Sequence, residues 1–377
     1  MPDPYLLTPG PLTTSAPVKQ AMLRDWGSRD ETFIAMNRRV RARLAELAGA
    51  EDTHVCVPVQ GSGTFAVEAA LGTLVPRTGR LLVLVNGAYG RRMVQIARVI
   101  GRDCRFLETA ENEPVSPAAL DRALDEDPDI THVAVVQCET TTGLLNPVEE
   151  VAAICARHGR ALLIDAMSGF GALPLDARRT PFEAVMASAN KCLEGVPGLG
   201  FVIVRQQALE AAAGNAHSLS LDLHAQWRGF EQNGQWRFTP PTHVLAALDR
   251  ALDEHAEEGG VAGRGARYRR NLRVLLDGMA ALGFVPLLPA ALQAPIIVTF
   301  RMPADPRFAF DCFYEGLRRR GYVIYPGKLT VAESFRMGCI GRLDVAVMQG
   351  AVAAVANTLG EMGVRSGAPQ RDGDSTP

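Results

Sequence analysis

The stretch Ala161-Leu-Leu-Ile-Asp165 places an acidic residue directly after a short apolar run, and this pattern is a clear indication of the fold class. Such a run is typical of a strand that is buried on both faces of a parallel sheet. Similar runs occur at residues 81–85, 133–136 and 200–204. Stretches with helical spacing of apolar residues separate them. The chain therefore predicts an α/β fold in which helices cover both faces of a large, mostly parallel sheet.

The composition is that of an ordinary globular protein. The 377 residues are 47% hydrophobic, and 39 Lys and Arg stand against 41 Asp and Glu. This balance offers no basic excess for nucleic acid, and no apolar run approaches the roughly 20 residues that span a bilayer. The start, Met1-Pro-Asp-Pro4, does not resemble a signal peptide. We expect a cytoplasmic protein without nucleic-acid or membrane partners and, since its Cys and His residues lack ligand spacing, without a metal.

Gly61-Ser-Gly-Thr64 stands directly ahead of a predicted helix over residues 64–74. The two glycines allow a ligand to approach the backbone, and the N–H groups at a helix N-terminus attract an anion. The hydroxyls of Ser62 and Thr64 add two donors, which favours a bound phosphate. The alternative is a Ser or Thr that only caps the helix.

The same glycines, followed by Ala66, also fit the pattern of dinucleotide-binding proteins. That pattern requires an acidic residue at the end of the next strand to bind the ribose. The run at 81–85 is followed by Asn86 instead. Pro58 also interrupts the preceding apolar run, which disfavours a central strand there. A nicotinamide-dependent dehydrogenase is therefore the weaker interpretation.

Asp165 and Lys191 are the other two residues that the pattern singles out. Asp165 ends a predicted strand, so its carboxylate is expected at the carboxyl edge of the sheet, where open α/β sheets bind ligands. Lys191 lies among small and apolar residues in Ser188-Ala-Asn-Lys-Cys192, where desolvation makes an amine nucleophilic. A structural ion pair or helix cap for Asp165, and an exposed strand end for Lys191, are the alternatives.

Together the three sites match one cofactor, pyridoxal 5′-phosphate. The helix N-terminus would bind its phosphate, and Asp165 would hold its protonated pyridine nitrogen. Lys191 would form the Schiff base with its aldehyde. Each predicted site thus corresponds to one chemical feature of the same molecule, and we predict this cofactor.

Several stretches of the chain also resemble one enzyme class in content and order, from about residue 5 to residue 360. They are Leu7-Thr-Pro-Gly-Pro-Leu12, Gly61-Ser-Gly-Thr-Phe-Ala-Val-Glu-Ala69, Asn86-Gly-Ala-Tyr-Gly-Arg-Arg-Met93, Glu139-Thr-Thr-Thr-Gly143, Ser188-Ala-Asn-Lys-Cys192, Trp236-Arg-Phe-Thr-Pro240 and Phe335-Arg-Met-Gly-Cys-Ile-Gly341. On these motifs the sequence resembles the fold-type I, class V aminotransferases, which use pyridoxal phosphate. Within that class it is most similar to the transaminases that act on 2-aminoethylphosphonate.

The resemblance implies a role for each residue of the three sites. Lys191 is similar to the family's Schiff-base lysine, which also shuttles a proton. Asp165 corresponds to the partner of the pyridine nitrogen. Ser62, Gly63 and Thr64 correspond to the family's phosphate-binding segment, which we name the phosphate cup.

Four more roles follow from the resemblance. Tyr89 occupies the position where the class stacks an aromatic ring on the cofactor, although a merely packed tyrosine is the alternative. Thr140 corresponds to a hydroxyl that hydrogen-bonds the cofactor. Thr239 matches a residue that the neighbouring subunit supplies to the phosphate. Arg336 resembles the arginine that binds the acidic end of the substrate.

Arg336 is also singled out by its own surroundings. It lies between Phe335 and Met337 in a predicted strand without another charge. The guanidinium group donates paired hydrogen bonds, which suits a carboxylate or a phosphonate. The alternative is an isolated ion pair between domains.

The resemblance and the change in pattern near residue 255 together imply the domain organisation. We expect an N-terminal arm over residues 1–16, a large cofactor-binding domain over 17–255, a small α+β C-terminal domain over 256–365 and a disordered tail over 366–377. The class forms homodimers with the active site at the subunit interface, and we expect the same here.

The activity that the resemblance implies is the transfer of the amino group of 2-aminoethylphosphonate to pyruvate. The expected products are phosphonoacetaldehyde and L-alanine. An alanine– or serine–glyoxylate aminotransferase of the same class is the nearest alternative, because it also binds an acidic substrate through an arginine. A catalytically silent regulatory protein of the same fold is the alternative outside the enzymes, and the presence of Lys191 and Arg336 disfavours it.

Overall fold

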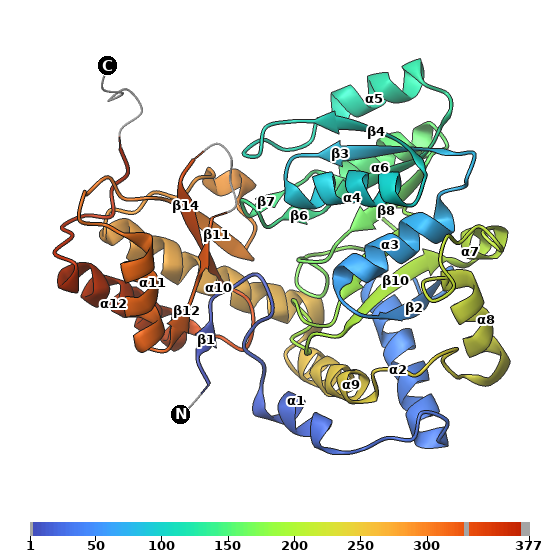
Figure 1. Cartoon of the computed structure of the whole chain (residues 1–377), viewed down its shortest axis with the longest axis horizontal. Coiled ribbons are helices and arrows are strands. Elements are labelled where there is room, and N and C mark those ends of the chain that lie inside the picture. The colour runs from blue at the N-terminus through green and yellow to red at the C-terminus, as the bar shows by residue number, and fades with distance from the viewer. Residues whose placement is uncertain (1–2, 328–331, 371–377) are drawn as a thin grey trace. The chain divides into compact units, whose positions relative to one another are not determined.

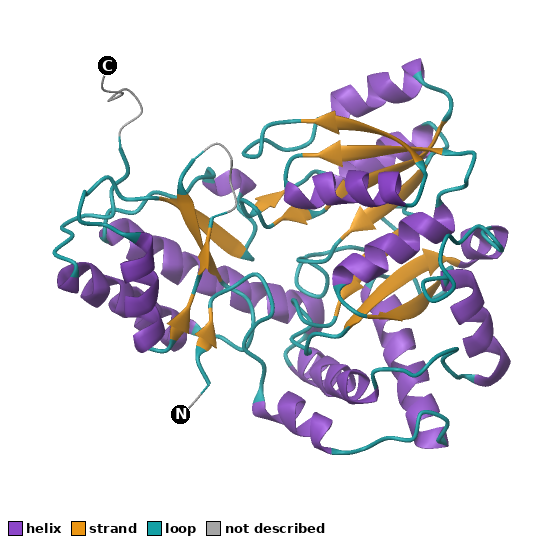
Figure 2. Ribbon diagram, viewed as in Figure 1, coloured by secondary structure: helices purple, strands orange, loops and turns teal. Residues whose placement is uncertain are grey.

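The computed structural model describes residues 3–327 and 332–370 (Figures 1 and 2). Contacts within the chain divide it into two compact units. The large unit comprises residues 14–139 and 145–264, and the small unit comprises the described parts of 1–13, 140–144 and 265–377. The tail expected over 366–377 lies outside the described residues from 371 onward. In the described part of the chain, no helix is long and apolar enough to cross a membrane.

The large unit is built on a sheet in which, over the described residues, seven strands follow the order β2-β10-β9-β8-β5-β3-β4. Neighbouring strands are parallel, except that β10 runs antiparallel to both β2 and β9. The large, mostly parallel sheet is therefore confirmed. The strands are β2 (His54–Gln60), β3 (Arg80–Val85), β4 (Asp103–Glu108), β5 (Ile130–Val136), β8 (Ala161–Asp165), β9 (Ala184–Ser188) and β10 (Leu199–Arg205).

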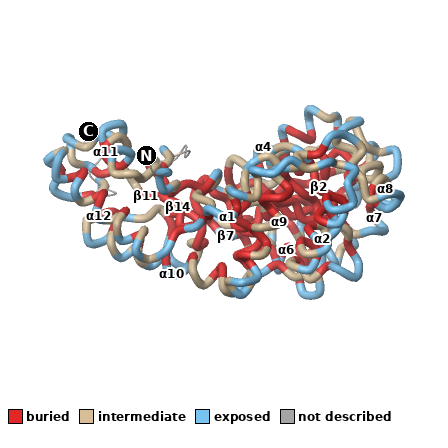
Figure 3. Tube along the Cα trace, turned by 90° about the horizontal axis from the view of Figure 1, so that it is seen from below, coloured by how far each residue is buried: buried red, intermediate tan, exposed pale blue. Residues whose placement is uncertain are grey.

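Alternate residues of the strands face two separate cores. Leu82 and Leu84 of β3 belong to a core shared with α2, α6 and α9, whereas Leu81 and Val83 belong to one shared with α3, α4 and α8. Helices thus cover both faces, and the trace near β2 is largely buried (Figure 3). The helices of this unit are α1 (Ala16–Gln20), α2 (Glu31–Leu47), α3 (Gly63–Leu74), α4 (Ala88–Val99), α5 (Pro117–Glu126), α6 (Val148–Arg157), α7 (Gln206–Ala211), α8 (Leu223–Asn233) and α9 (Thr242–Glu257).

Strand β2 lies at the edge of the sheet, and this position explains how it accommodates a proline. Pro58 pairs with Phe201 of β10, and β10 separates β2 from the parallel strands. An edge strand has a neighbour on one side only, so a residue without an N–H group is tolerated there. The sequence pattern disfavoured a central strand at this point, and the strand is indeed peripheral.

The small unit contains an antiparallel sheet of order β11-β14-β13 and a parallel pair of β1 with β12. Phe284, Phe300, Phe313 and Phe335 pack together in its core. The boundary between the units falls within α10, after Arg264. The elements are β1 (Tyr5–Leu6), α10 (Gly260–Ala281), β11 (Ile297–Arg301), α11 (Phe310–Arg319), β12 (Tyr322–Val323), β13 (Tyr325–Pro326), β14 (Ser334–Gly338) and α12 (Val345–Glu361). The short strand β6 (Cys138–Glu139) belongs to the large unit, and β7 (Leu144–Leu145) falls at a boundary between the units.

Candidate active site

The carboxyl edge of the large sheet carries Asp165 and Lys191. Asp165 is the last residue of β8 and pairs in register with Met186 of the parallel strand β9. Lys191 follows the end of β9 in the connection to β10. The two side chains are close enough for the charge of Lys191 to lower the pKa of Asp165. The predicted acid and the predicted lysine therefore meet at the same edge of the sheet.

The carboxylate of Asp165 is only 4% exposed. Burial raises its pKa to about 6, and the nearby Glu139 adds to this. The N–H of Met167, which donates to Asp165 Oδ1 at 2.9 Å, and the charges of Lys191 and Arg92 act in the opposite direction. A buried carboxylate with a raised pKa is stabilised by a cation placed against it. The chemistry of this group therefore fits the protonated pyridine nitrogen of pyridoxal phosphate.

The N-terminus of α3 lacks the side-chain cap that some other helices of the unit have. The side chain of Ser62 precedes the helix but makes no capping hydrogen bond. By contrast, the side chain of Ser116 caps α5 and that of Asp222 caps α8. The interpretation of Ser62 as a simple helix cap is therefore wrong. Its hydroxyl and the first turn of α3 stay the predicted site for a phosphate.

The phosphate cup lies against the turn that follows Asp165. A Cβ atom added to Gly63 would overlap the side chain of Met167, so the glycine allows this close approach. Thr64 Oγ1 accepts a hydrogen bond of 3.3 Å from Arg92 Nη1. An arginine from α4 thus joins the hydroxyls at the start of α3, and the donor set suits a phosphate.

Tyr89 lies in the first turn of α4, where two contacts orient it. The guanidinium carbon of Arg92 lies 5.0 Å from the centroid of its ring. Its backbone N–H donates to Glu139 Oε2 at 3.1 Å. A Cβ atom at Gly87 would overlap the Glu139 side chain, so this glycine leaves room for the carboxylate at the start of the helix. The backbone of Tyr89 is therefore held by Glu139, and its ring is contacted by Arg92 of the same helix.

Sequence reasoning assigned no role to Arg92 or Glu139. Both lie inside motifs that carry the family resemblance, and this was the available signal. Arg92 links the phosphate cup to the ring of Tyr89, and Glu139 is a fully buried carboxylate that affects Asp165. These two residues belong to the candidate site as supports of the predicted groups.

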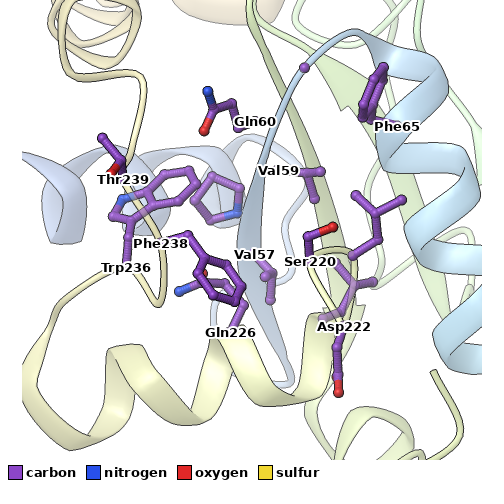
Figure 4. A pocket seen from close by; sticks show the side chains of 14 residues that line it. Val57, Val59, Gln60, Phe65, Ser220, Asp222, Gln226, Trp236, Phe238 and Thr239 are labelled. Atoms are coloured by element: carbon purple, nitrogen blue, oxygen red, sulfur yellow. The ribbon is translucent and has the colours of Figure 1, made fainter. Parts of the chain in front are cut away.

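Thr239 lies elsewhere in the large unit. It is exposed and lines a pocket of about 480 Å³ together with Gln60, Phe65, Trp236 and Phe238. Figure 4 shows Phe65 on α3 and the other aromatic residues on the segment that precedes α9. Over the described residues, neither Asp165 nor Lys191 lines this pocket. This pocket therefore does not join Thr239 to Asp165 or Lys191.

Thr140 and Arg336 both belong to the small unit, and the structure brings them together. Arg336 lies in the middle of β14, opposite Thr299 of β11 and Tyr325 of β13. It is 1% exposed, and its Nη1 donates to the carbonyl oxygen of Thr140 at 3.0 Å. Its Nε donates to the carbonyl oxygen of Pro326 at 3.1 Å. The two carbonyls fix the direction of the guanidinium group.

Comparisons with known proteins agree with the fold. Residues 17–305 match the family model described as aminotransferase class-V. Among solved structures, the alanine–glyoxylate aminotransferase from Nostoc sp. matches with a TM-score of 0.89 and 24% identity, over 95% of this chain and 96% of that chain. The pyridoxamine–pyruvate aminotransferase from Mesorhizobium loti matches with a TM-score of 0.87 and 24% identity, over 97% and 95%. The fold is that of a fold-type I aminotransferase.

Curated relatives point to one group of enzymes within this class. A 2-aminoethylphosphonate–pyruvate transaminase from Burkholderia lata is 58% identical over 96% of this chain and 96% of its own length. One from Pseudomonas putida strain KT2440 is 57% identical over 96% and 98%. The chain belongs to the class-V aminotransferase family, on the branch of these 2-aminoethylphosphonate–pyruvate transaminases, and the resemblance and the predicted fold type are confirmed.

Proposed function

We propose that this enzyme transfers the amino group of 2-aminoethylphosphonate to pyruvate and releases phosphonoacetaldehyde and L-alanine. The observation that carries the proposal is the 58% identity, over 96% of the chain, to a relative of that activity. The buried, backbone-fixed Arg336 supports it, because both the phosphonate and the carboxylate of pyruvate are oxyanions. One site can therefore serve both substrates in turn, and ping-pong kinetics are expected.

Lys191 and Asp165 carry the chemical step in this proposal. Pyridoxal phosphate, when bound, supplies an electron sink that stabilises negative charge on the carbon bearing the amino group. Lys191 would hold the cofactor covalently, and its amine would accept and return the proton of the substrate carbon that bears the amino group. Asp165 would hold the protonated pyridine nitrogen, because a buried carboxylate attracts a cation in surroundings of low dielectric.

The remaining residues of the large unit bind and orient. Ser62, Gly63 and Thr64 hold the phosphate through hydroxyls and the N–H groups at the start of α3, with Arg92 beside Thr64. Tyr89 provides the ring against which the cofactor stacks. The carbonyl oxygen of Thr140 accepts a hydrogen bond from Arg336. In this proposal the hydroxyl of Thr140 would bind the cofactor.

We also propose that the enzyme is a homodimer whose subunits complete each other's sites. Phe65 and Phe238 are each 49% exposed and line the pocket that contains Thr239. Apolar rings around a recess are typical of a surface that a partner covers. A second copy seated there would place the partner subunit's Thr239 at the phosphate. Analytical ultracentrifugation is expected to show a dimer that Phe238→Glu dissociates.

The decisive experiment combines spectroscopy and turnover. The purified enzyme is expected to show an absorption band near the visible edge that 2-aminoethylphosphonate removes and pyruvate restores, with one L-alanine formed per cycle. Robust turnover of serine with glyoxylate, without turnover of the phosphonate, would instead support the nearest alternative. No half-reaction with any amine would support the silent regulatory protein. Fluorescence titration with NAD(P)H tests the dehydrogenase, and no enhancement is expected.

A further inference from the structure

The connection that carries Lys191, residues 189–198, contains an unusual backbone conformation. Glu194 has φ of +60°, and among the described residues it is the one non-glycine residue with a positive φ. Its N–H donates to the carbonyl oxygen of Lys191 at 2.8 Å, which closes a tight turn directly after the lysine. A left-handed conformation is unfavourable for a residue with a side chain and persists only where its surroundings impose it.

A buried arginine from α10 provides those surroundings. Arg264 is fully buried, and its Nη1 donates to the carbonyl oxygen of Cys192, the residue that follows Lys191. The same Nη1 lies 3.5 Å from Glu194 Oε1. Its Nε donates to Glu258 Oε2 at 2.6 Å. One guanidinium group therefore contacts both the backbone beside the lysine and the side chain of Glu194, the residue whose N–H closes the turn.

The cluster of Arg264, Glu194 and Glu258 is better suited to fixing the positions of its neighbours than to stabilising the fold. A buried ion pair contributes little net stability, because desolvating the charges offsets their attraction. A planar guanidinium, however, directs its N–H donors along fixed lines, so it constrains the groups that it contacts. The carbonyl of Cys192 and the carboxylate of Glu194 are thereby held in one relative position. The contacts of Arg264 with Cys192 and Glu194 therefore constrain the path of the backbone just after Lys191.

We propose that Arg264 is a positioning residue for Lys191, and that it acts through Cys192 and Glu194 to direct the amine to the site. This inference rests on the proposed function, in which Lys191 is the residue of covalent attachment. Arg264 would orient the backbone next to Lys191 and would not contact the substrate. Misplacing a reacting group by about 1 Å costs on the order of 100-fold in rate, so the backbone behind the lysine is a sensitive place.

The test compares Arg264→Lys with a matched control. Lysine keeps the charge that Glu194 and Glu258 require but loses the directed donors. The control is Arg102→Lys, because Arg102 is also buried (4% exposed) and also donates to backbone carbonyls, those of Gly72 and Asn215, at 2.8 Å. Both variants are expected to lose similar thermal stability, which separates positioning from folding.

The expected result differs between the two variants in three measurements. For R264K, kcat is expected to fall about 10- to 100-fold with KM for 2-aminoethylphosphonate nearly unchanged. The pH midpoint of the bound cofactor's absorption band shifts, and the cofactor dissociates faster on dilution. For R102K, all three stay at wild-type values. A wild-type kcat and midpoint in R264K, or equal losses in R102K, would overturn the inference.

Two further measurements keep the outcome clear. Glu194→Gly removes the carboxylate while allowing the left-handed backbone, so it is expected to fold and to shift the same spectral midpoint; an unshifted midpoint counts against the inference even if R264K is unstable. Borohydride trapping with peptide mapping is done on the wild type first. A label away from Lys191 refutes the proposed function, whereas a label at Lys191 with unaltered variants refutes only the role of Arg264.

Discussion

The two groups of site residues are held in different ways by the two units. In the large unit, Asp165 and Lys191 stand at or beyond the ends of strands, and other side chains support them. In the small unit, Arg336 lies in mid-strand with a strand on each side. A residue at a strand end depends on neighbouring side chains, whereas the ladder sets where the side chain of Arg336 leaves the backbone and two backbone carbonyls orient its guanidinium group. We therefore expect substitutions in the first group to alter the cofactor and those in the second to alter substrate affinity.

The largest effect is expected from Lys191→Ala. Loss of proton transfer alone removes about 10²- to 10⁴-fold in rate, and loss of the covalent link adds to it. Alanine formation from 2-aminoethylphosphonate and pyruvate is the measurement, together with the absorption band of the bound cofactor. Lys19→Ala serves as the control, since Lys19 lies in α1. A rate within 10-fold of the wild type would remove Lys191 from the large-unit group.

Arg336→Lys tests the other side of the comparison. A lysine cannot make the paired hydrogen bonds to an oxyanion, and charged hydrogen bonds are worth about 1.5–3 kcal/mol, so KM for both substrates is expected to rise roughly 10- to 100-fold. The cofactor's absorption band and its dissociation constant stay unchanged. A loss of the band would show that the mid-strand arginine serves the cofactor, and the contrast between the units would fail.

Asp165→Asn tests the large-unit group through the pH dependence of folding stability, measured in the cofactor-free protein. Burial raises the pKa of Asp165 from 3.8 to about 6, so between these values the folded chain keeps a proton that the unfolded chain has lost. The wild type therefore loses stability as pH rises through this window. The asparagine variant does not titrate and keeps an acceptor for the N–H of Met167. Its advantage is expected to grow from pH 4 to pH 6 and to level off at no more than about 3 kcal/mol.

Urea denaturation at intervals from pH 4 to pH 8 measures this difference. Asp176→Asn is the control of opposite sign, because Arg178 lowers the pKa of Asp176 to about 2. The stability that Asp176 contributes is present above pH 3.8 and is lost as pH falls towards 2. This variant is therefore expected to be slightly less stable than the wild type, without a trend above pH 5. A pH-independent effect of Asp165→Asn would contradict a raised pKa.

The smallest effect is expected from Thr64→Ala. The variant loses one hydroxyl of the phosphate cup, and a neutral hydrogen bond contributes about 1 kcal/mol, so cofactor binding weakens roughly 5-fold. KM for pyruvate is expected to stay the same. Thr64→Ser, which keeps the hydroxyl, is the control and binds as the wild type does. Equal weakening in both variants would indicate lost packing instead of a lost donor.

Buried regular elements were predictable because their signal is local. Residues 161–165 form β8 as predicted, and the run at 81–85 lies within β3. Strand and helix ends were less accurate where no turn residue marks them. The start of α4 at Ala88 is an example, because Glu139 receives the N–H of Tyr89 there. That contact joins residues 50 positions apart and leaves no local trace.

The supports of the site were not predictable from pattern alone. Glu139, Glu194 and Arg264 are charged residues that the fold buries, and a sequence does not show which distant charge will face which. Arg264 stands in an arginine-rich helix, where it cannot be told from its exposed neighbours. The chemically distinctive residues Asp165 and Lys191 were recognisable because they interrupt apolar surroundings. Their roles, with those of Tyr89, Thr239 and Arg336, stay predictions.

The reversed direction of β10 has a consequence for how the enzyme tolerates change in length. Because β10 is antiparallel to β9, the chain returns at the same edge, and residues 189–198 suffice to join them. Parallel strands would need a crossover of about a dozen residues or more. Lys191 thus lies in a short connection whose two ends continue directly into strands of the sheet. A single inserted or deleted residue there would move the amine, while surface connections far from this hairpin can grow without harm.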